Sequence, residues 1–405
     1  MARRQPAVGF IFVTLVLDVL GIGLIVPILP KLIEELSAGD VTQASRTYGL
    51  LAALYSLMQF LCAPLLGNLS DRFGRRPVIL NSLLGSGLDL LLLAWAPTLP
   101  WFYLGRILAG VSGASFSAAT AYIADVTPPE RRAQSFGLIG AAFGLGFIIG
   151  PVLGGVLGNY GLRIPFLAAA GLTLVNWLYG LFVLPESLKP ENRRAFEWSR
   201  ANPVTSLLAL RRYPVVFGLA GTYFLINLAH QVFPSTWVLY TTHRYGWSVR
   251  ETGLSLGLVG IMAAVVQAGL SRRIIPALGE EKATLLGLLV GTVSMVAYGL
   301  APQGWMMYAI IVIGSFGGIT SPAVQGIISR NIGANEQGAV QGSLGSLVSV
   351  AGIAGPPLAT GLFGHFIRPE VAWHLPGVAF FFSAILTSIG WILAARSFSR
   401  RKQVV

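Results

Sequence analysis

Charged residues are scarce in this chain of 405 residues, since Asp, Glu, Lys and Arg make up only 11% and hydrophobic residues make up 54%. Soluble domains carry about 25% charged residues, so an ordinary soluble domain is excluded. Cysteine is nearly absent too: Cys62 is the only one, which excludes an internal disulfide and a cysteine-based metal site. We find no nucleotide-binding loop, nucleophile–base pair or metal cluster. We therefore expect no enzyme, no metal and no cofactor.

Long apolar runs take the place of charge. Twelve of them approach the ~20 residues that an α-helix needs to cross a bilayer core. They cover residues 8–29, 48–66, 78–96, 101–123, 135–157, 165–184, 215–240, 252–270, 283–301, 305–328, 340–363 and 376–395. This pattern predicts an all-α membrane protein with twelve transmembrane helices.

The positive charge follows the predicted spans. Net charge is +12, and most of the 28 Lys and Arg fall in the segments that would be cytoplasmic if the N-terminus were cytoplasmic. This bias predicts a multi-pass protein of the cytoplasmic (inner) membrane with both termini cytoplasmic. A nucleic-acid interface would need a basic soluble domain, which is missing. We expect the lipid bilayer and a small-molecule substrate as partners, no nucleic acid, and a monomer.

A polar stretch divides the spans six and six. We expect an N-terminal six-helix bundle (1–184), a cytoplasmic linker (185–214) and a C-terminal six-helix bundle (215–405). Gly150-Pro151 in the fifth span is echoed by Gly355-Pro356 in the eleventh, and a charged turn at 67–77 has a partial counterpart at 269–282. Two pseudo-symmetric bundles suit a transporter that rocks about a midplane site. The Gly-Pro pairs serve either as hinges or as static packing contacts.

Three charged residues lie within predicted spans. Asp18 and Asp89 fall near the middle of the first and third, where an acid costs about 2.5–3.5 kcal/mol and requires a partner, water or a proton. Proton coupling is one reading, and permanent hydrogen bonding between helices is the other. Arg106 in the fourth span either pairs with one of these acids or anchors a packing contact.

The charged turn is a candidate gate. Its residues are Gly67, Asp71, Arg72, Gly74, Arg75 and Arg76. We expect Asp71 to accept backbone hydrogen bonds and to pair with an arginine, with Arg75 and Arg76 at the wet interface. Such a cluster latches one state of a transport cycle, or simply anchors topology.

The second half has no acid inside a predicted span and offers neutral polar groups instead. Together with Gln59 they suit a ligand pocket with apolar walls and a few amide contacts, although each alone also fits an interhelical hydrogen bond. These candidates are Tyr223, Asn227, His230, Gln231, Gln267, Gln325 and Gln341.

The turn has the form G-x-L-x-D-R-x-G-R-R, which is a signature of major facilitator superfamily transporters. With segments 17–30, 54–67, 104–106 and 123–128, the chain resembles the tetracycline/proton antiporters of the drug efflux branch. The resemblance implies the major facilitator fold, with Asp18, Asp89 and Arg106 as the family's membrane-embedded charges and Gln59 on the substrate path. It also implies gating by Asp71 and Arg75, and its Gly-Pro motif favours export.

Two positions depart from that resemblance. Gly291 stands where tetracycline carriers have an acid, and Ala263 where they have a histidine. We therefore expect a secondary transporter that exports an amphipathic or drug-like molecule, rather than tetracycline itself, in exchange for protons by alternating access. The alternatives are a pH-independent facilitator or proton symporter of a metabolite, and a non-transporting membrane receptor on the same fold.

Overall fold

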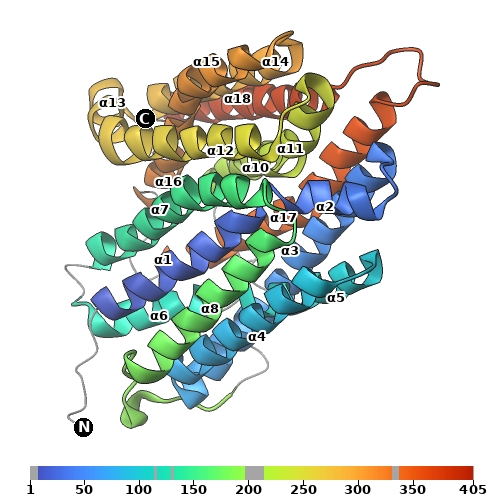
Figure 1. The fold of residues 1–405 in the computed structure, drawn as a ribbon. Coiled ribbons are helices and arrows are strands. Elements are labelled where there is room, and N and C mark those ends of the chain that lie inside the picture. Colours follow the sequence, from blue (N-terminus) through green and yellow to red (C-terminus); the bar gives the residue numbers. More distant parts are fainter. Residues whose placement is uncertain (1–7, 114–115, 129–131, 197–213, 331–336, 405) are drawn as a thin grey trace. The chain divides into compact units, whose positions relative to one another are not determined.

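The computed structural model describes residues 8–113, 116–128, 132–196, 214–330 and 337–404, and within these ranges every regular element is a helix (Figure 1). Eleven helices or joined helices are long and apolar enough to cross a membrane. The remaining expected span, 215–240, is the seventh along the chain. It corresponds to two shorter helices with a break between them at Gln231. Pro234 explains the break, because a proline has no N–H to donate to the carbonyl four residues earlier. The predicted all-α membrane architecture is confirmed.

The helices of the first half of the chain lie between residues 8 and 192. They are α1 (Val8–Ile25), α2 (Leu29–Leu36), α3 (Val41–Phe73), α4 (Arg75–Trp95), α5 (Leu99–Gly113), α6 (Phe116–Val126), α7 (Arg132–Gly158) and α8 (Ile164–Phe182), followed by the short η2 (Pro190–Asn192). Those of the second half are α10 (Pro214–His230), α11 (Val232–Tyr245), α12 (Val249–Ala264), the π-helix η5 (Val265–Leu270), α13 (Ser271–Leu278), α14 (Glu280–Leu300), α15 (Gly304–Gly314), η6 (Ser315–Ile319), α16 (Thr320–Arg330), α17 (Gln337–Phe366) and α18 (Val378–Val404).

The chain forms two compact units. The first holds residues 1–38, 54–203 and 248–260, and the second holds 39–53, 204–247 and 261–405. Each unit includes a segment from the opposite half of the sequence. The first unit takes most of α12, and the second takes the first part of α3. The boundaries 1–184, 185–214 and 215–405 remain a prediction, and residues 197–213 of the linker lie outside the described ranges.

The predicted charged turn is shorter than expected. Helix α3 continues to Phe73, so Gly67, Asp71 and Arg72 are helical, and only Gly74 separates α3 from α4. Gly74 has φ of 107°, a backbone conformation that side-chain-bearing residues rarely adopt. Glycine therefore permits a reversal of direction within a single residue.

Within the first unit, α7 packs on α1 through glycine. A Cβ added to Gly23 would lie 2.8 Å from the carbonyl oxygen of Gly146 and 2.9 Å from the Cα of Gly150. On another face of α7, a Cβ at Gly155 would lie 2.9 Å from the carbonyl oxygen of Val249. Small residues let membrane helices approach closely, so the predicted Gly150-Pro151 segment forms a packing contact with α1.

In the second unit, the Gly355-Pro356 pair lies inside α17. A Cβ at Gly355 would lie 2.5 Å from the Cβ of Gln231, so this glycine makes room for the break between α10 and α11. The Thr360 hydroxyl donates to the Pro356 carbonyl at 2.8 Å, which gives that carbonyl a second partner in the proline-containing helix.

We expect Gly23→Ala to destabilise the protein by about 1–3 kcal/mol, because the added methyl group overpacks the contact of α1 with α7. Gly171→Ala in α8 is the matched control, since a Cβ there would meet nothing within 4 Å. Thermal unfolding in detergent measures both. An equal midpoint for the two variants would contradict the close approach of α1 and α7.

Candidate functional site

The Arg75 side chain is the centre of a cluster at the junction of α3 and α4. Its Nη1 donates to Ser70 Oγ at 2.7 Å and pairs with Asp71, and its Nε donates to Asp125 Oδ2 at 3.1 Å. The expected pairing of Asp71 with an arginine is confirmed. The expectation that Arg75 stays at the wet interface is wrong, because it is only 7% exposed. The first turn of α4 directs it inward to two acids, which offset its desolvation.

The N-terminal end of α4 is also fixed by Glu186, which follows α8. The carboxylate of Glu186 accepts from the backbone N–H of Arg75 at 2.9 Å and of Arg76 at 3.2 Å. Two orphan donors of a helix N-terminus are thereby satisfied by a negative charge. Ser187 donates to Asp125 Oδ2 at 2.9 Å, which joins this segment to the Arg75 cluster.

The other residues of the predicted gate lie around this cluster. The Gly67 carbonyl accepts from Ser70 Oγ at 2.7 Å. Arg76 is half-buried and donates to the Leu181 carbonyl at 2.6 Å, whereas Arg72 is exposed and lies over the Phe73 ring at 5.0 Å. We call Arg75, Asp71, Asp125, Ser70, Glu186 and Ser187 the α4 latch.

Sequence reasoning missed four members of the α4 latch, namely Ser70, Asp125, Glu186 and Ser187. Asp125 lies 50 residues from Arg75 and Glu186 lies 111 residues away, and Ser187 follows Glu186. The sequence offers one indication of Asp125 and Glu186. Each acid follows a long apolar run by two residues, where a helix is expected to leave the membrane. Without a partner in view, that position alone does not indicate a role.

A second charged group lies deeper in the first unit. Asp89 of α4 is 2% exposed, and its Oδ2 lies 3.7 Å from Nη2 of Arg106 on α5. Asp89 Oδ1 and Arg106 Nε are buried and have no hydrogen-bond partner among the described residues. Gly105 makes room for the acid, because a Cβ there would lie 2.6 Å from Asp89 Oδ1. The pair is therefore buried but incompletely satisfied.

Tyr55 connects this pair with the rest of the unit's interior. Its ring centroid lies 6.0 Å from the Arg106 guanidinium carbon, and the tyrosine is within electrostatic range of both Arg106 and Asp18. Gln59 donates to Tyr55 Oη at 3.4 Å and to the Gly113 carbonyl at 3.3 Å. Gln59, predicted as a substrate contact, thus makes one hydrogen bond within α3 and one to α5, and Tyr55 was not predicted.

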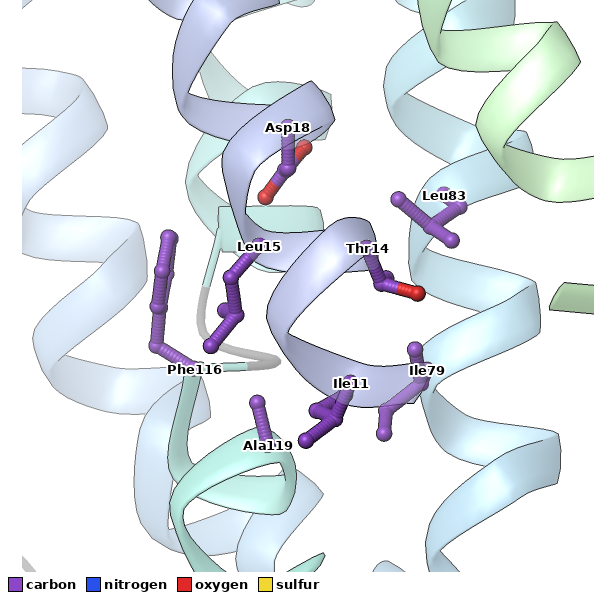
Figure 2. Close-up of a pocket in the computed structure, with 8 residues that line it drawn as sticks. All are labelled: Ile11, Thr14, Leu15, Asp18, Ile79, Leu83, Phe116 and Ala119. Atoms are coloured by element: carbon purple, nitrogen blue, oxygen red, sulfur yellow. The ribbon is translucent and has the colours of Figure 1, made fainter. Parts of the chain in front are cut away.

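Asp18 lines a small cavity between α1, α4 and α6 (Figure 2). The cavity has a volume of about 10 Å³, which is the space that one water centre needs. Its other walls are apolar except for Thr14. Asp18 makes no hydrogen bond or ion pair to a described residue. In this it differs from Asp89, which pairs with Arg106. Figure 2 shows its carboxyl group on the side of α1 where Leu15 and Phe116 lie.

The neutral polar residues of the second unit gather in part. The side-chain amide of Gln325 on α16 donates to Tyr223 Oη at 3.3 Å, and that of Asn227 donates to the Tyr223 carbonyl at 2.8 Å. His230 and Gln267 have exposed side-chain surface, and Gln231 packs against Gly355. The side chain of Gln341 lies outside the described part of the chain. Tyr223, Asn227 and Gln325 therefore form one polar group on α10 and α16.

The helices and buried charges define a multi-pass membrane transporter rather than an enzyme. Residues 11–356 match the family model described as Major Facilitator Superfamily. The chain belongs to the major facilitator superfamily, which confirms the predicted twelve-helix fold.

Similar proteins include two tetracycline resistance proteins of Escherichia coli. The class C protein is 43% identical over 361 residues, which cover 89% of this chain and 90% of that protein. The class B protein is 37% identical over 385 residues and 94% of both chains. Multidrug resistance protein 2 of Bacillus subtilis (strain 168) is 30% identical over 85% of both chains.

Solved structures agree with this assignment. The human organic anion transporter MFSD10 (TETRAN) is 27% identical, with a TM-score of 0.72 over 96% of this chain and 100% of that one. A bacterial homologue of the human lysosomal transporter Spinster, inward-facing and unoccupied, has a TM-score of 0.76 at 17% identity over 97% of both chains. The latter likeness supports the fold alone.

We expect Arg75→Lys to destabilise the protein by about 1.5–3 kcal/mol, because a lysine cannot replace the planar fork that contacts Ser70, Asp71 and Asp125 together. Arg72→Lys is the control, since Arg72 is exposed and lies only over the Phe73 ring. The thermal midpoint in detergent reports the difference. A midpoint for Arg75→Lys as high as that of the control would show that the α4 latch contributes no stability.

Proposed function

We propose that this protein exports a small amphipathic or drug-like molecule in exchange for protons, by alternating access, with both termini in the cytoplasm. The single observation that carries the proposal is the buried pair of Asp89 and Arg106 at 3.7 Å, in which each partner keeps an unsatisfied polar atom. A purely structural ion pair inside a bundle would be expected to satisfy those atoms, because an orphaned buried group costs about 1–3 kcal/mol. The names of the relatives, which are resistance proteins, support export.

Proton exchange at Asp89 gives the pair two states. The ionised carboxylate attracts the Arg106 guanidinium, whereas the protonated acid loses that attraction and becomes a hydrogen-bond donor. Arg106 can then turn toward the face of Tyr55, which already lies 6.0 Å away. Substrate binding that favours one of these arrangements shifts the equilibrium between the two exposures, and this differential affinity couples the two fluxes.

Asp18 is the second proton-coupling residue of the proposal. It lacks a protein partner among the described residues and adjoins a cavity with room for about one water. Water is the partner that an intramembrane acid needs in order to exchange a proton. Tyr55 lies within electrostatic range of Asp18 and of Arg106, the partner of Asp89.

The α4 latch is the proposed gate. It ties α4 to α3, to α6 and to the segment after α8 through charged groups of opposite sign. Such contacts are few and polar, so they can separate and re-form without repacking an apolar core. The Gly150-Pro151 and Gly355-Pro356 segments would provide the close helix packing against which the gate works.

Substrate recognition falls to the polar group of the second unit and to Gln59. Tyr223, Asn227 and Gln325 present hydroxyl and amide groups but no charge. With Gly291 and Ala263 in place of an acid and a histidine, this unit favours an uncharged or weakly charged substrate. A facilitator or symporter of a metabolite remains the second candidate, favoured by the fact that Gln59 and the Tyr223 group are already internally hydrogen-bonded.

We expect Asp89→Asn to abolish the proton flux that substrate elicits, because an amide cannot ionise. The measurement is dissipation of an imposed pH gradient in proteoliposomes after substrate is added. Asp40→Asn is the matched control, because Asp40 is exposed and caps the start of α3 through Thr42 at 2.8 Å. Coupling that persists in Asp89→Asn would remove Asp89 from the mechanism, and wild-type transport indifferent to the gradient would favour the facilitator.

We expect the wild-type protein to protect cells against neutral amphipathic compounds more strongly than against tetracycline. Gly291→Asp should reverse this order, because a Cβ at Gly291 meets nothing within 4 Å and an acid fits there. The measurement is growth, in the presence of a panel of compounds, of cells that carry the wild-type protein or Gly291→Asp. Gly291→Asn is the uncharged control. If Asp and Asn give the same profile, the charge at this position does not select the substrate.

A further inference from the structure

The partial counterpart of the charged turn has a different environment from the turn itself. Arg75 is buried between two acids, whereas Arg272 and Arg273 at the start of α13 are exposed. Neither makes a hydrogen bond or ion pair to a described residue. This pair therefore does not form an internal latch within the described part of the chain, and its charge faces the surroundings.

An apolar groove begins at the next residue. Ile274 of α13 lines it together with Leu286 and Val290 of α14, Ile313 of α15, and Phe316 and Ile319 of η6. The groove holds about 190 Å³ and no polar residue lines it. Leu286 is 44% exposed and Ile313 is 64% exposed, so it opens outward. Around a membrane-spanning segment, the medium at such an opening is hydrocarbon.

The groove lies at the depth of one leaflet. Helix α14 begins at Glu280, so at ~1.5 Å per residue Leu286 and Val290 lie about 9 and 15 Å along it. Half of a bilayer core is also ~15 Å, so both residues fall within that depth. The groove can therefore receive a segment of one acyl chain.

Helix α13 is held in place beside the groove. Ile274 and Ile275 pack against a buried cluster that includes Val266 and Ile319. The Ser271 hydroxyl donates to the Val266 carbonyl at 2.8 Å, across the π-helical turn η5. The arginines are therefore presented from a fixed helix rather than from a loop.

We propose that α13 and this groove bind one anionic phospholipid, with its phosphate on Arg272 and Arg273 and a segment of one acyl chain in the groove. Its place in the cytoplasmic leaflet rests on the topology of the proposed function. The nearby Glu280 does not compete for these arginines, because it pairs with Arg330 at 3.2 Å. Glu281 and Lys282 follow on the same turn and offset each other in charge. A zwitterionic lipid fills the groove equally well but gains less from the two guanidinium groups.

The test uses the full chain in bilayers of phosphatidylcholine that contain a minority of phosphatidylglycerol. After transfer to mild detergent, native mass spectrometry counts the lipids that stay bound. We expect one phosphatidylglycerol to be retained with a preference of about 30-fold over its bulk share, as two arginines at a membrane surface provide. Arg272→Gln with Arg273→Gln should abolish this preference, and Ile313→Trp, which fills the groove, should release the lipid.

Matched controls separate this site from general basic attraction. Arg193→Gln with Arg194→Gln removes another exposed basic pair and should leave the preference unchanged. Glycerol phosphate in excess should not displace the lipid, because it lacks the acyl chain. Retention in the bulk ratio by the wild-type protein, an unchanged preference in the Arg272/Arg273 variant, or displacement by glycerol phosphate would each overturn the proposal. Leu286→Phe, a smaller change, repeats the groove test if Ile313→Trp does not fold.

Discussion

The cost of holding charge away from water is the constraint on which the first unit depends. Arg75 is buried only because Asp71 and Asp125 accept from it, and the first amides of α4 are satisfied only because Glu186 reaches them. Removing one partner of such a group leaves the others uncompensated, which costs about 3–5 kcal/mol. The Asp89–Arg106 pair obeys the same rule less completely, because Asp89 Oδ1 and Arg106 Nε have no hydrogen-bond partner among the described residues.

Much of this molecule could be predicted from its sequence, because bilayer thickness translates directly into helix length. All but one of the expected spans appear as continuous membrane-crossing helices, or as helices joined end to end, and the exception breaks at Gln231 where Pro234 removes a donor. The pairing of Asp71 with an arginine was predictable because the partners are only four residues apart in the sequence, on either side of Gly74. Asp125 and Glu186 were not, since contacts over 50 and 111 residues depend on how helices pack.

The two halves have diverged in how they handle polar groups. The first unit concentrates acidic and basic side chains in its interior, at Asp18, Asp89, Arg106 and the α4 latch. The second has neutral hydroxyl and amide groups at Tyr223, Asn227 and Gln325, and its basic turn faces outward. The sequence showed this division as an unequal distribution of acids. It did not show that Gln59 bonds to Gly113 or that Arg75 is buried, because solvent exposure follows from the direction of a side chain and not from its place in a loop.

Helix α4 carries a member of each of the two charged groups, Arg75 of the α4 latch and Asp89 of the buried pair. Arg75 is its first residue and Asp89 is fourteen residues further, about 21 Å along the axis. Between them, close to the acid, lies Gly85-Ser86-Gly87, and Gly/Ser pairs are sites at which helices bend. The helix therefore has a place where the acid can shift while the turn that holds the guanidinium stays where it is.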